Sequence, residues 1–198
     1  MAIPGFLRGR RLNARTIGSP SLFTLYEVAH RGVSTSEAYL ARLNNPTPWT
    51  RKMLAQSNYV SRTLCNVVTS LGRGTGSKTI TVRFPTSPEP VANFVTGLCA
   101  YLTSEFSPRG THLATHLLSR DTETERPISA ENGIRTRTDN YDDVIVVLEG
   151  TDLAVLRSLV TDRLSTEFLN RYELPKNALI DEYELAHLLS HQELSETA

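Results

Sequence analysis

The distribution of hydrophobic and polar positions predicts short strands alternating with helices. Runs rich in β-branched and aromatic residues, bounded by Gly, Pro and polar residues, are typical of strands. Such runs lie at residues 5–15, 21–29, 58–71, 79–84, 110–119 and 144–149. The first two flank the turn-forming segment 16–20, which predicts a β-hairpin. The run 144–149 (VIVVLE) is almost wholly apolar, which indicates a buried strand.

Capping signals and apolar residues at helical spacing predict four helices. Ser34 and Glu37 form a capping box for a helix that continues to residue 43. Thr47 is an N-cap with Pro48 at the first helical position of the next helix. Two longer helices are expected over residues 87–106 and, capped by Thr151 or Asp152, over residues 152–168.

The last element, residues 180–189, can be interpreted in two ways. The composition of residues 182–194 favours a helix, whereas Tyr183, Leu185 and His187 alternate with other residues as in a strand. We favour a strand for its first part.

The glycine-rich segment 72–79 resembles a phosphate-binding loop but lacks two of its requirements. Ser77 stands where that loop needs Gly immediately before Lys78, and a strand follows instead of a helix. We therefore interpret the segment as a flexible linker between two halves of the chain. Residues 120–143 form a second, longer polar connection.

The two halves of the chain contain similar sequence patterns. Residues 23–27 and 145–149 are similar strands, each ending in a glutamate and leading into a helix. The second half has the order β-α-β-β-α-β of a ferredoxin-like unit, and the first half has only β-β-α-β. We interpret Glu27 and Glu149 as caps of the following turns or as exposed residues, with an acid or base role as the alternative.

Three short motifs carry a resemblance to a known family. Residues 4–6 (PGF), 25–27 (LYE) and 46–50 (PTPWT) resemble the EthD-like group of the dimeric α+β barrel superfamily. The resemblance implies an α+β fold with two ferredoxin-like units in one chain, antiparallel sheets and helices on one face. Residues 1–76 would be an incomplete unit with the Gly-rich linker, and residues 77–198 a complete one.

The incomplete first unit leads to a structural expectation. In this family a strand and a helix normally precede the Pro-Gly-Phe segment, and that strand is central in the order 4-1-3-2. Without it, strands 3 and 4 of the first unit lose their common neighbour. We expect a shortened version of the module, from an internal start, with its sheet completed by rearranged pairing or by a second chain.

Composition and charge limit the classes of partner that we expect for this protein. The 21 Lys and Arg residues balance 21 Asp and Glu residues, which gives no electrostatic reason to expect nucleic acid or a membrane as a partner. Cys65 and Cys99 lack metal-ligand spacing and are expected to be reduced in a cytoplasmic protein. Charge is uneven locally, because four arginines precede the first acid, Glu27. We interpret this as a solvated or anion-facing hairpin, with a presequence and a nucleic-acid arm as alternatives.

Three histidines are candidate catalytic residues. A neutral imidazole on the inner face of a sheet can act as a general base or bind a small ligand. The candidates are His187, His112 and His116, and the last two are expected to share one strand face. We expect no metal and no dedicated cofactor, with haem as an alternative.

Four further residues are candidate ligand-binding groups. They are Tyr26, Tyr183, Trp49 and Arg10. The resemblance implies a protein that binds, and in one interpretation transforms, a small and mostly apolar organic molecule in a cleft between sheet and helices. The alternative is a non-catalytic ligand carrier or an assembly protein that uses an exposed sheet edge. A homodimer is a further expectation.

Overall fold

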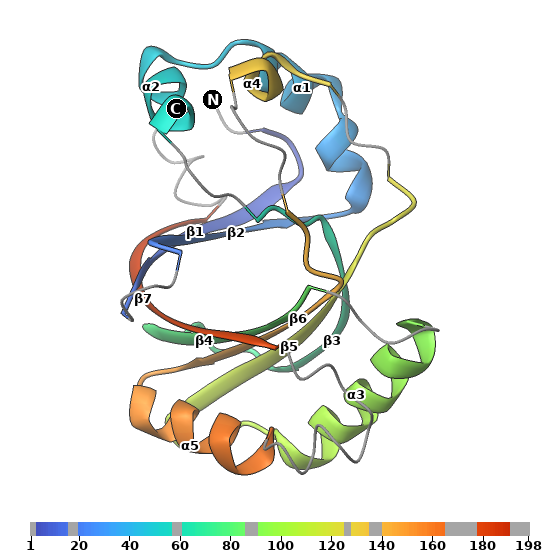
Figure 1. Cartoon of the computed structure of the whole chain (residues 1–198), viewed down its shortest axis with the longest axis vertical. Coiled ribbons are helices and arrows are strands. Elements are labelled where there is room, and N and C mark those ends of the chain that lie inside the picture. Colours follow the sequence, from blue (N-terminus) through green and yellow to red (C-terminus); the bar gives the residue numbers. More distant parts are fainter. Residues whose placement is uncertain are drawn as a thin grey trace.

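A single curled sheet forms the centre of the molecule, in a computed structural model that describes residues 3–15, 20–56, 61–85, 91–124, 128–134, 140–164 and 178–190 (Figure 1). Its seven strands are β1 (Phe6–Ala14), β2 (Leu22–Val28), β3 (Cys65–Gly72), β4 (Lys78–Phe84), β5 (His112–Arg120), β6 (Val144–Gly150) and β7 (Leu179–Ser190). The helices are the 3-10 turn η1 (Arg31–Thr35), α1 (Glu37–Asn44), α2 (Pro48–Gln56), α3 (Val91–Glu105), α4 (Ala130–Ile134) and α5 (Leu153–Arg163).

The strands lie in the order β2-β1-β7-β4-β6-β5-β3, and every neighbouring pair is antiparallel. The second half of the chain supplies the four strands β7-β4-β6-β5. Numbered along that half, their order is 4-1-3-2. The first half adds β1 and β2 beside β7 and adds β3 beside β5. All seven strands therefore form one continuous sheet.

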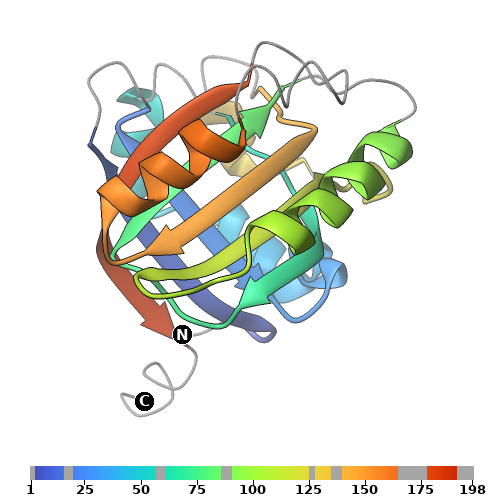
Figure 2. The ribbon, with the colours of Figure 1, turned by 90° about the horizontal axis from the view of Figure 1, so that it is seen from below.

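The hydrophobic core lies between the convex face of the sheet and helices α3 and α5 (Figure 2). Alternation along β4 sends Ile80, Val82 and Phe84 to this side, where they meet α3 residues such as Phe94 and Leu98. All of these side chains are at least nine-tenths buried. The space between the sheet and helices α3 and α5 is therefore packed.

The concave side of the sheet, which we call the inner face, has a different composition. The residues that alternate with the core positions lie there: Thr79, Thr81 and Arg83 of β4 and Ile145, Val147 and Glu149 of β6. Leu118 and Cys65 pack against the two apolar members. Polar and apolar groups thus share an inner face that lies on the side of the sheet opposite helices α3 and α5, and all six of these residues are buried.

The strands of the first half of the chain join the strands of the second half. Residues 1–71 form no four-stranded sheet within their described part, because β1 pairs with β7, and β3 pairs with β5. Among the described residues, β2 pairs only with β1, and β3 only with β5. These two strands form the open edges of the sheet.

Helix α1 begins two residues later than expected. Residues 31–35 form the 3-10 turn η1, in which Ser34 donates a hydrogen bond to the carbonyl of Arg31. Ser36 is therefore the N-cap, and its side chain accepts from the N–H of Tyr39. The prediction of Thr47 as the next cap is confirmed, since its Oγ1 accepts from the N–H of Thr50.

Other element boundaries differ modestly from the expectations. Helix α3 is described from Val91, so the expected start at residues 87–90 lies outside the described residues, as does the end expected for α5 beyond Leu164. Asp152, not Thr151, caps α5 by accepting from the N–H of Ala154. The strand predicted for the first part of residues 180–189 is confirmed, and it continues to Ser190.

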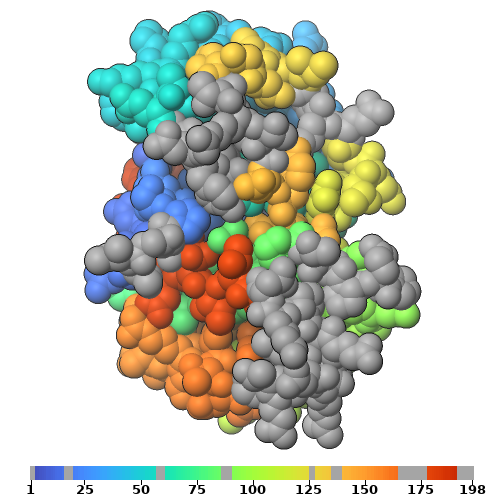
Figure 3. All heavy atoms as spheres, in the orientation of Figure 1, coloured from blue at the N-terminus to red at the C-terminus, as the bar shows by residue number. Residues whose placement is uncertain are grey.

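Three further features complete the description of the fold. Helices α2 and α4 lie together at one end of the molecule (Figure 3). Cys65 and Cys99, both within the described residues, are not joined by a disulfide. In the described part of the chain, no helix is long and apolar enough to cross a membrane.

Candidate functional site

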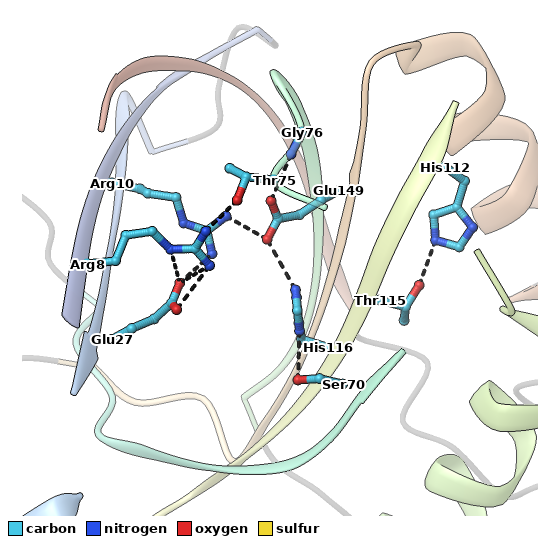
Figure 4. A network of polar contacts seen from close by, with 10 residues as sticks. All are labelled: Arg8, Arg10, Glu27, Ser70, Thr75, Gly76, His112, Thr115, His116 and Glu149. Carbon is cyan, nitrogen blue, oxygen red and sulfur yellow. Dashed lines mark hydrogen bonds and ion pairs between the residues drawn. The ribbon is translucent and has the colours of Figure 1, made fainter. Parts of the chain in front are cut away.

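A network of charged and polar residues occupies the inner face of the sheet (Figure 4). We call it the inner-face cluster. Its members are Arg8 and Arg10 of β1, Glu27 of β2, Ser70 of β3, Thr75 and Gly76 of the loop before β4, His116 of β5 and Glu149 of β6. Five strands and one loop therefore converge on one network.

The ion pair between Arg10 and Glu149 crosses the inside of the curled sheet. Nη1 of Arg10 lies 2.6 Å from Oε1 of Glu149, although β7 and β4 separate their two strands in the sheet. Arg10 is 4% exposed and Glu149 is 0% exposed. A buried charge needs such a partner, because an isolated ion loses its hydration without compensation.

Glu27 extends the network toward the edge strand β2. It accepts from Nη2 of Arg10 at 2.9 Å and from Nε and Nη2 of Arg8 at 3.0 and 2.8 Å. Arg8 also donates to Oγ1 of Thr75. The basic hairpin noted in the sequence is therefore partly neutralised by carboxylates on the inner face.

The glycine-rich segment is part of this site. The N–H of Gly76 donates to Oε2 of Glu149 at 3.1 Å. A side chain at this position would place its Cβ 2.3 Å from the backbone nitrogen of Gly150, so only glycine permits the close approach. The segment that the sequence presents as a linker thus supplies a hydrogen-bond donor to the cluster.

His116 lies between a hydroxyl and a carboxylate. Its Nε2 is 3.2 Å from Oε1 of Glu149, and its Nδ1 is 2.9 Å from Oγ of Ser70. An ionised carboxylate can only accept, so we assign the ring proton to Nε2. In the neutral ring, Nδ1 is then the acceptor and Ser70 the donor.

The surroundings of Glu149 keep it ionised. Burial alone would raise the pKa of this carboxyl, but hydrogen bonds with His116, Arg10 and the N–H of Gly76, together with the charge of Arg10, lower it to about 2. Glu149 is therefore a fixed negative charge at neutral pH. Neither glutamate is the exposed residue or simple turn cap that the sequence suggests.

Besides Oε1 of Glu149, whose contacts are the ion pairs with Arg10 and His116, three buried polar atoms on the inner face have no hydrogen-bond partner among the described residues. They are Oγ1 of Thr79, Oγ1 of Thr81 and Nε of Arg10, each on a side chain more than nine-tenths buried. Thr79 lies directly opposite Glu149 in the sheet, and Thr81 directly opposite Val147. Buried polar groups are almost always paired, so these atoms mark a place where a bound molecule would supply the partner.

A second polar cluster on the inner face is formed by Arg83 and two aspartates. Arg83 lies 2.7 Å from Asp181 and 3.2 Å from Asp142, and Asp142 also accepts from Ser61 at 2.8 Å. Burial disfavours the charged guanidinium, but the two carboxylates outweigh it and raise the pKa of Arg83. None of its fully buried side-chain atoms among the described residues lacks a partner, which is typical of a structural network.

The three candidate histidines do not converge. The expectation that His112 and His116 share a face is wrong, because the register shifts between His112 and Ala114 and reverses the alternation. His112 lies away from the inner-face cluster and bonds Oγ1 of Thr115 at 2.8 Å (Figure 4). Burial lowers its pKa, opposed by a backbone hydrogen bond with Ala114. His187 is exposed on β7.

The four candidate ligand-binding residues are also dispersed. Arg10 lies at the centre of the inner-face cluster. Tyr26 and Trp49 are 63% and 64% exposed, and Tyr26 packs edge-on against Phe6. Tyr183 is buried beside Phe23, with ring centroids 5.3 Å apart. The structure therefore unites Arg10 and His116 and leaves the other candidates outside the cluster.

The ring nitrogens of His116 and Nε2 of His112 are not available to a haem iron. A haem iron needs an imidazole nitrogen that is not already engaged. Both ring nitrogens of His116 have protein partners, and Nε2 of His112 is bonded to Thr115. Within the described ranges, no group of three or more His, Cys, Asp or Glu side chains is arranged to hold a metal ion.

Comparisons with known proteins define the fold. No protein-family model and no curated protein matches the chain. One similar solved structure is a candidate monooxygenase from Fusobacterium nucleatum subsp. nucleatum, with a TM-score of 0.57, 9% identity, and coverage of 96% of this chain and 80% of that chain. Another is an anthrone oxidase-like protein, with a TM-score of 0.61, 10% identity, and coverage of 96% and 81%. The chain thus has a mixed α+β fold consistent with the expected α+β barrel.

Proposed function

We propose that the inner face of the curled sheet binds a small, mostly apolar organic molecule that carries at least one oxygen function, in an EthD-like catabolic or accessory role. The observation that supports this most directly is the set of unpartnered buried atoms on Thr79, Thr81 and Arg10. Two hydroxyls and one guanidinium N–H can donate to a carbonyl or phenolic oxygen. Val147, Ile145 and Leu118 offer an apolar surface for the rest of the molecule.

The inner-face cluster also contains a group that can transfer a proton to or from the ligand. His116 can move a proton between its Nδ1 and a ligand placed beside it, because Glu149 holds the opposite nitrogen protonated. The two similar structures are named as a candidate monooxygenase and an anthrone oxidase-like protein. Those names agree with an organic substrate, and their likeness to this chain is one of fold.

Replacing Thr81 with valine tests the binding site. The change removes one unpartnered hydroxyl and keeps the shape, so folding stability should stay within about 0.5 kcal/mol of wild type. Affinity for a bound aromatic ketone or phenol should fall about fivefold, the value of one neutral hydrogen bond. The measurement is isothermal titration with a panel that includes anthrone and 1-naphthol.

The matched control is Thr115→Val. Thr115 is equally buried but bonds His112, away from the inner-face cluster. This variant should lose stability and keep the affinity. Equal affinities for wild type and Thr81→Val would contradict the proposed site.

A second candidate function is assembly of two copies of the chain through the open edges of the sheet. The directions of the edge strands favour it. In a sheet of seven antiparallel strands the two edge strands, β2 and β3, run in the same direction, so they cannot pair with each other in the antiparallel manner. A strand from a second copy could pair antiparallel with either edge. Val67 of β3 and Leu22 of β2 are exposed there.

Replacing Val67 with lysine tests this assembly. A charge on an exposed edge opposes strand pairing, so light scattering should give a dimer mass for wild type and a monomer mass for Val67→Lys. Val155→Lys, on the exposed face of α5, should remain dimeric. A wild-type protein that is monomeric at about 100 µM, well above the micromolar range of modest interfaces, would rule out the homodimer.

A further inference from the structure

Ser70, His116 and Glu149 form a continuous line of polar contacts across three strands (Figure 4). Ser70 Oγ is 2.9 Å from His116 Nδ1, and His116 Nε2 is 3.2 Å from Glu149 Oε1. The line contains a hydroxyl, an imidazole and an ionised carboxylate, in that order. It is the relation by which a base activates a serine while a third group orients the base.

The sheet register explains why these side chains meet. Ser70 of β3 stands directly opposite His116 of β5. On the other side, His116 is opposite Val147 of β6, which makes Glu149 its diagonal neighbour two residues along. The bulge between His112 and Ala114 leaves this register intact and places His112 on the opposite face.

We propose that Ser70 is a nucleophile activated by His116, which would give the inner face an acyl-transfer activity toward activated esters of small apolar carboxylic acids. This inference deepens the proposed function, because it assigns a reaction class to the same inner face.

The surroundings of the three residues favour this role. Ser70 is exposed on the edge strand, so an ester can approach its hydroxyl. Arg10 and the N–H of Gly76 hold Glu149 in place, and the carboxylate in turn lies against Nε2 of His116 and orients the ring. His112 and Thr115 form a similar imidazole and hydroxyl pair, but both are buried and no ion pair joins His112 to a carboxylate among the described residues. A substrate therefore cannot reach the Thr115 hydroxyl, and the His112 ring lacks a carboxylate that would orient it.

The reaction balances with water as the only co-reactant. Ser70 Oγ forms a bond to the ester carbonyl carbon, and its proton passes to Nδ1 of His116. The tetrahedral adduct then expels the alcohol, which takes up that proton. Water attacks the acyl-serine with His116 again as base, and the carboxylic acid leaves as Ser70 regains its hydrogen.

A fluorophosphonate probe tests the nucleophile without an identified substrate. Ser70 would displace fluoride from phosphorus, and the serine proton would pass to His116. Intact-protein mass spectrometry should show a single adduct, which peptide mapping should place at Ser70. Ser70→Ala should abolish this adduct, and His116→Gln should slow its formation at least about 100-fold, the usual contribution of a positioned base. Thr115→Val should be labelled at the wild-type rate.

Other outcomes would overturn the proposal. They are an unlabelled but folded wild type, labelling of Ser70 no faster than in the urea-unfolded chain, or a His116→Gln variant labelled at the wild-type rate. Circular dichroism establishes folding for each variant. Titration with the aromatic panel separates this result from the proposed function, since a protein that binds the panel but resists the probe retains the binding site and has no nucleophile.

Discussion

Glu149→Gln is expected to unfold at pH 7 with a free energy about 3 kcal/mol lower than that of wild type. This value follows from the pKa of Glu149, which lies at about 2 in the folded protein against an ordinary 4.5. The substitution leaves Arg10 buried without its full counter-charge, which acts in the same direction. Urea unfolding followed by circular dichroism at pH 7, 5 and 3 is the measurement.

The direction of the pKa shift of Glu149 determines how the stability of the two proteins changes with pH. A carboxyl with a lowered folded pKa stabilises the fold above its unfolded pKa, and this stabilisation is lost as the pH falls from about 4.5 toward 2. Wild type should therefore lose stability across that range, and Glu149→Gln should lose about 3 kcal/mol less. The difference between the two proteins should nearly vanish at about pH 2.

Glu105→Gln is the matched control. Glu105 pairs with Arg163 at a half-exposed position, where an ion pair contributes little. Its loss should change the free energy of unfolding by no more than about 0.5 kcal/mol at any pH. If Glu149→Gln behaves in the same way, the Arg10 and Glu149 bridge does not stabilise the fold.

Arg83→Met is expected to be the most destabilising of these substitutions, with a loss of about 3 to 5 kcal/mol at pH 7. The change leaves the carboxylates of Asp142 and Asp181 buried without their cation. Each carboxylate then bears a desolvation cost that no remaining charge offsets. Chemical unfolding at pH 7 measures this loss.

Two further variants separate charge from packing at Arg83. Adding Asp142→Asn and Asp181→Asn to Arg83→Met should restore part of the lost stability, because no uncompensated charge remains. Arg157→Met, which breaks an exposed pair with Glu182, should cost no more than about 1 kcal/mol. Equal losses for Arg83→Met and Arg157→Met would show that the buried network is not important for stability.

Local periodicity was sufficient to predict most of the strands. The apolar run at residues 144–149 and the alternation at residues 180–189 both correspond to strands of the sheet. Their side-chain pattern is set by the two faces that each strand presents, which is a property of the local sequence.

The inner-face cluster could be predicted only in part, because long-range contacts form it. Arg10 and His116 were candidates, but nothing near Arg10 in the sequence indicates Glu149 as its partner. The bulge before Ala114 separates His112 from His116, and no turn signal marks it. Glycine is required at position 76 because its backbone lies against that of Gly150. The pattern of a phosphate-binding loop carries no information about that contact.

The position of β1 between β2 and β7 has a consequence for the order of folding. Arg8 pairs with Ser190 and Ala14 with Tyr183, so these contacts close loops of about 170 to 180 residues. During synthesis the β1 and β2 hairpin emerges early but cannot join the sheet until β7 has left the ribosome. The Arg10 and Glu149 bridge therefore forms late, and until then the hairpin exposes its arginines to solvent or to a chaperone.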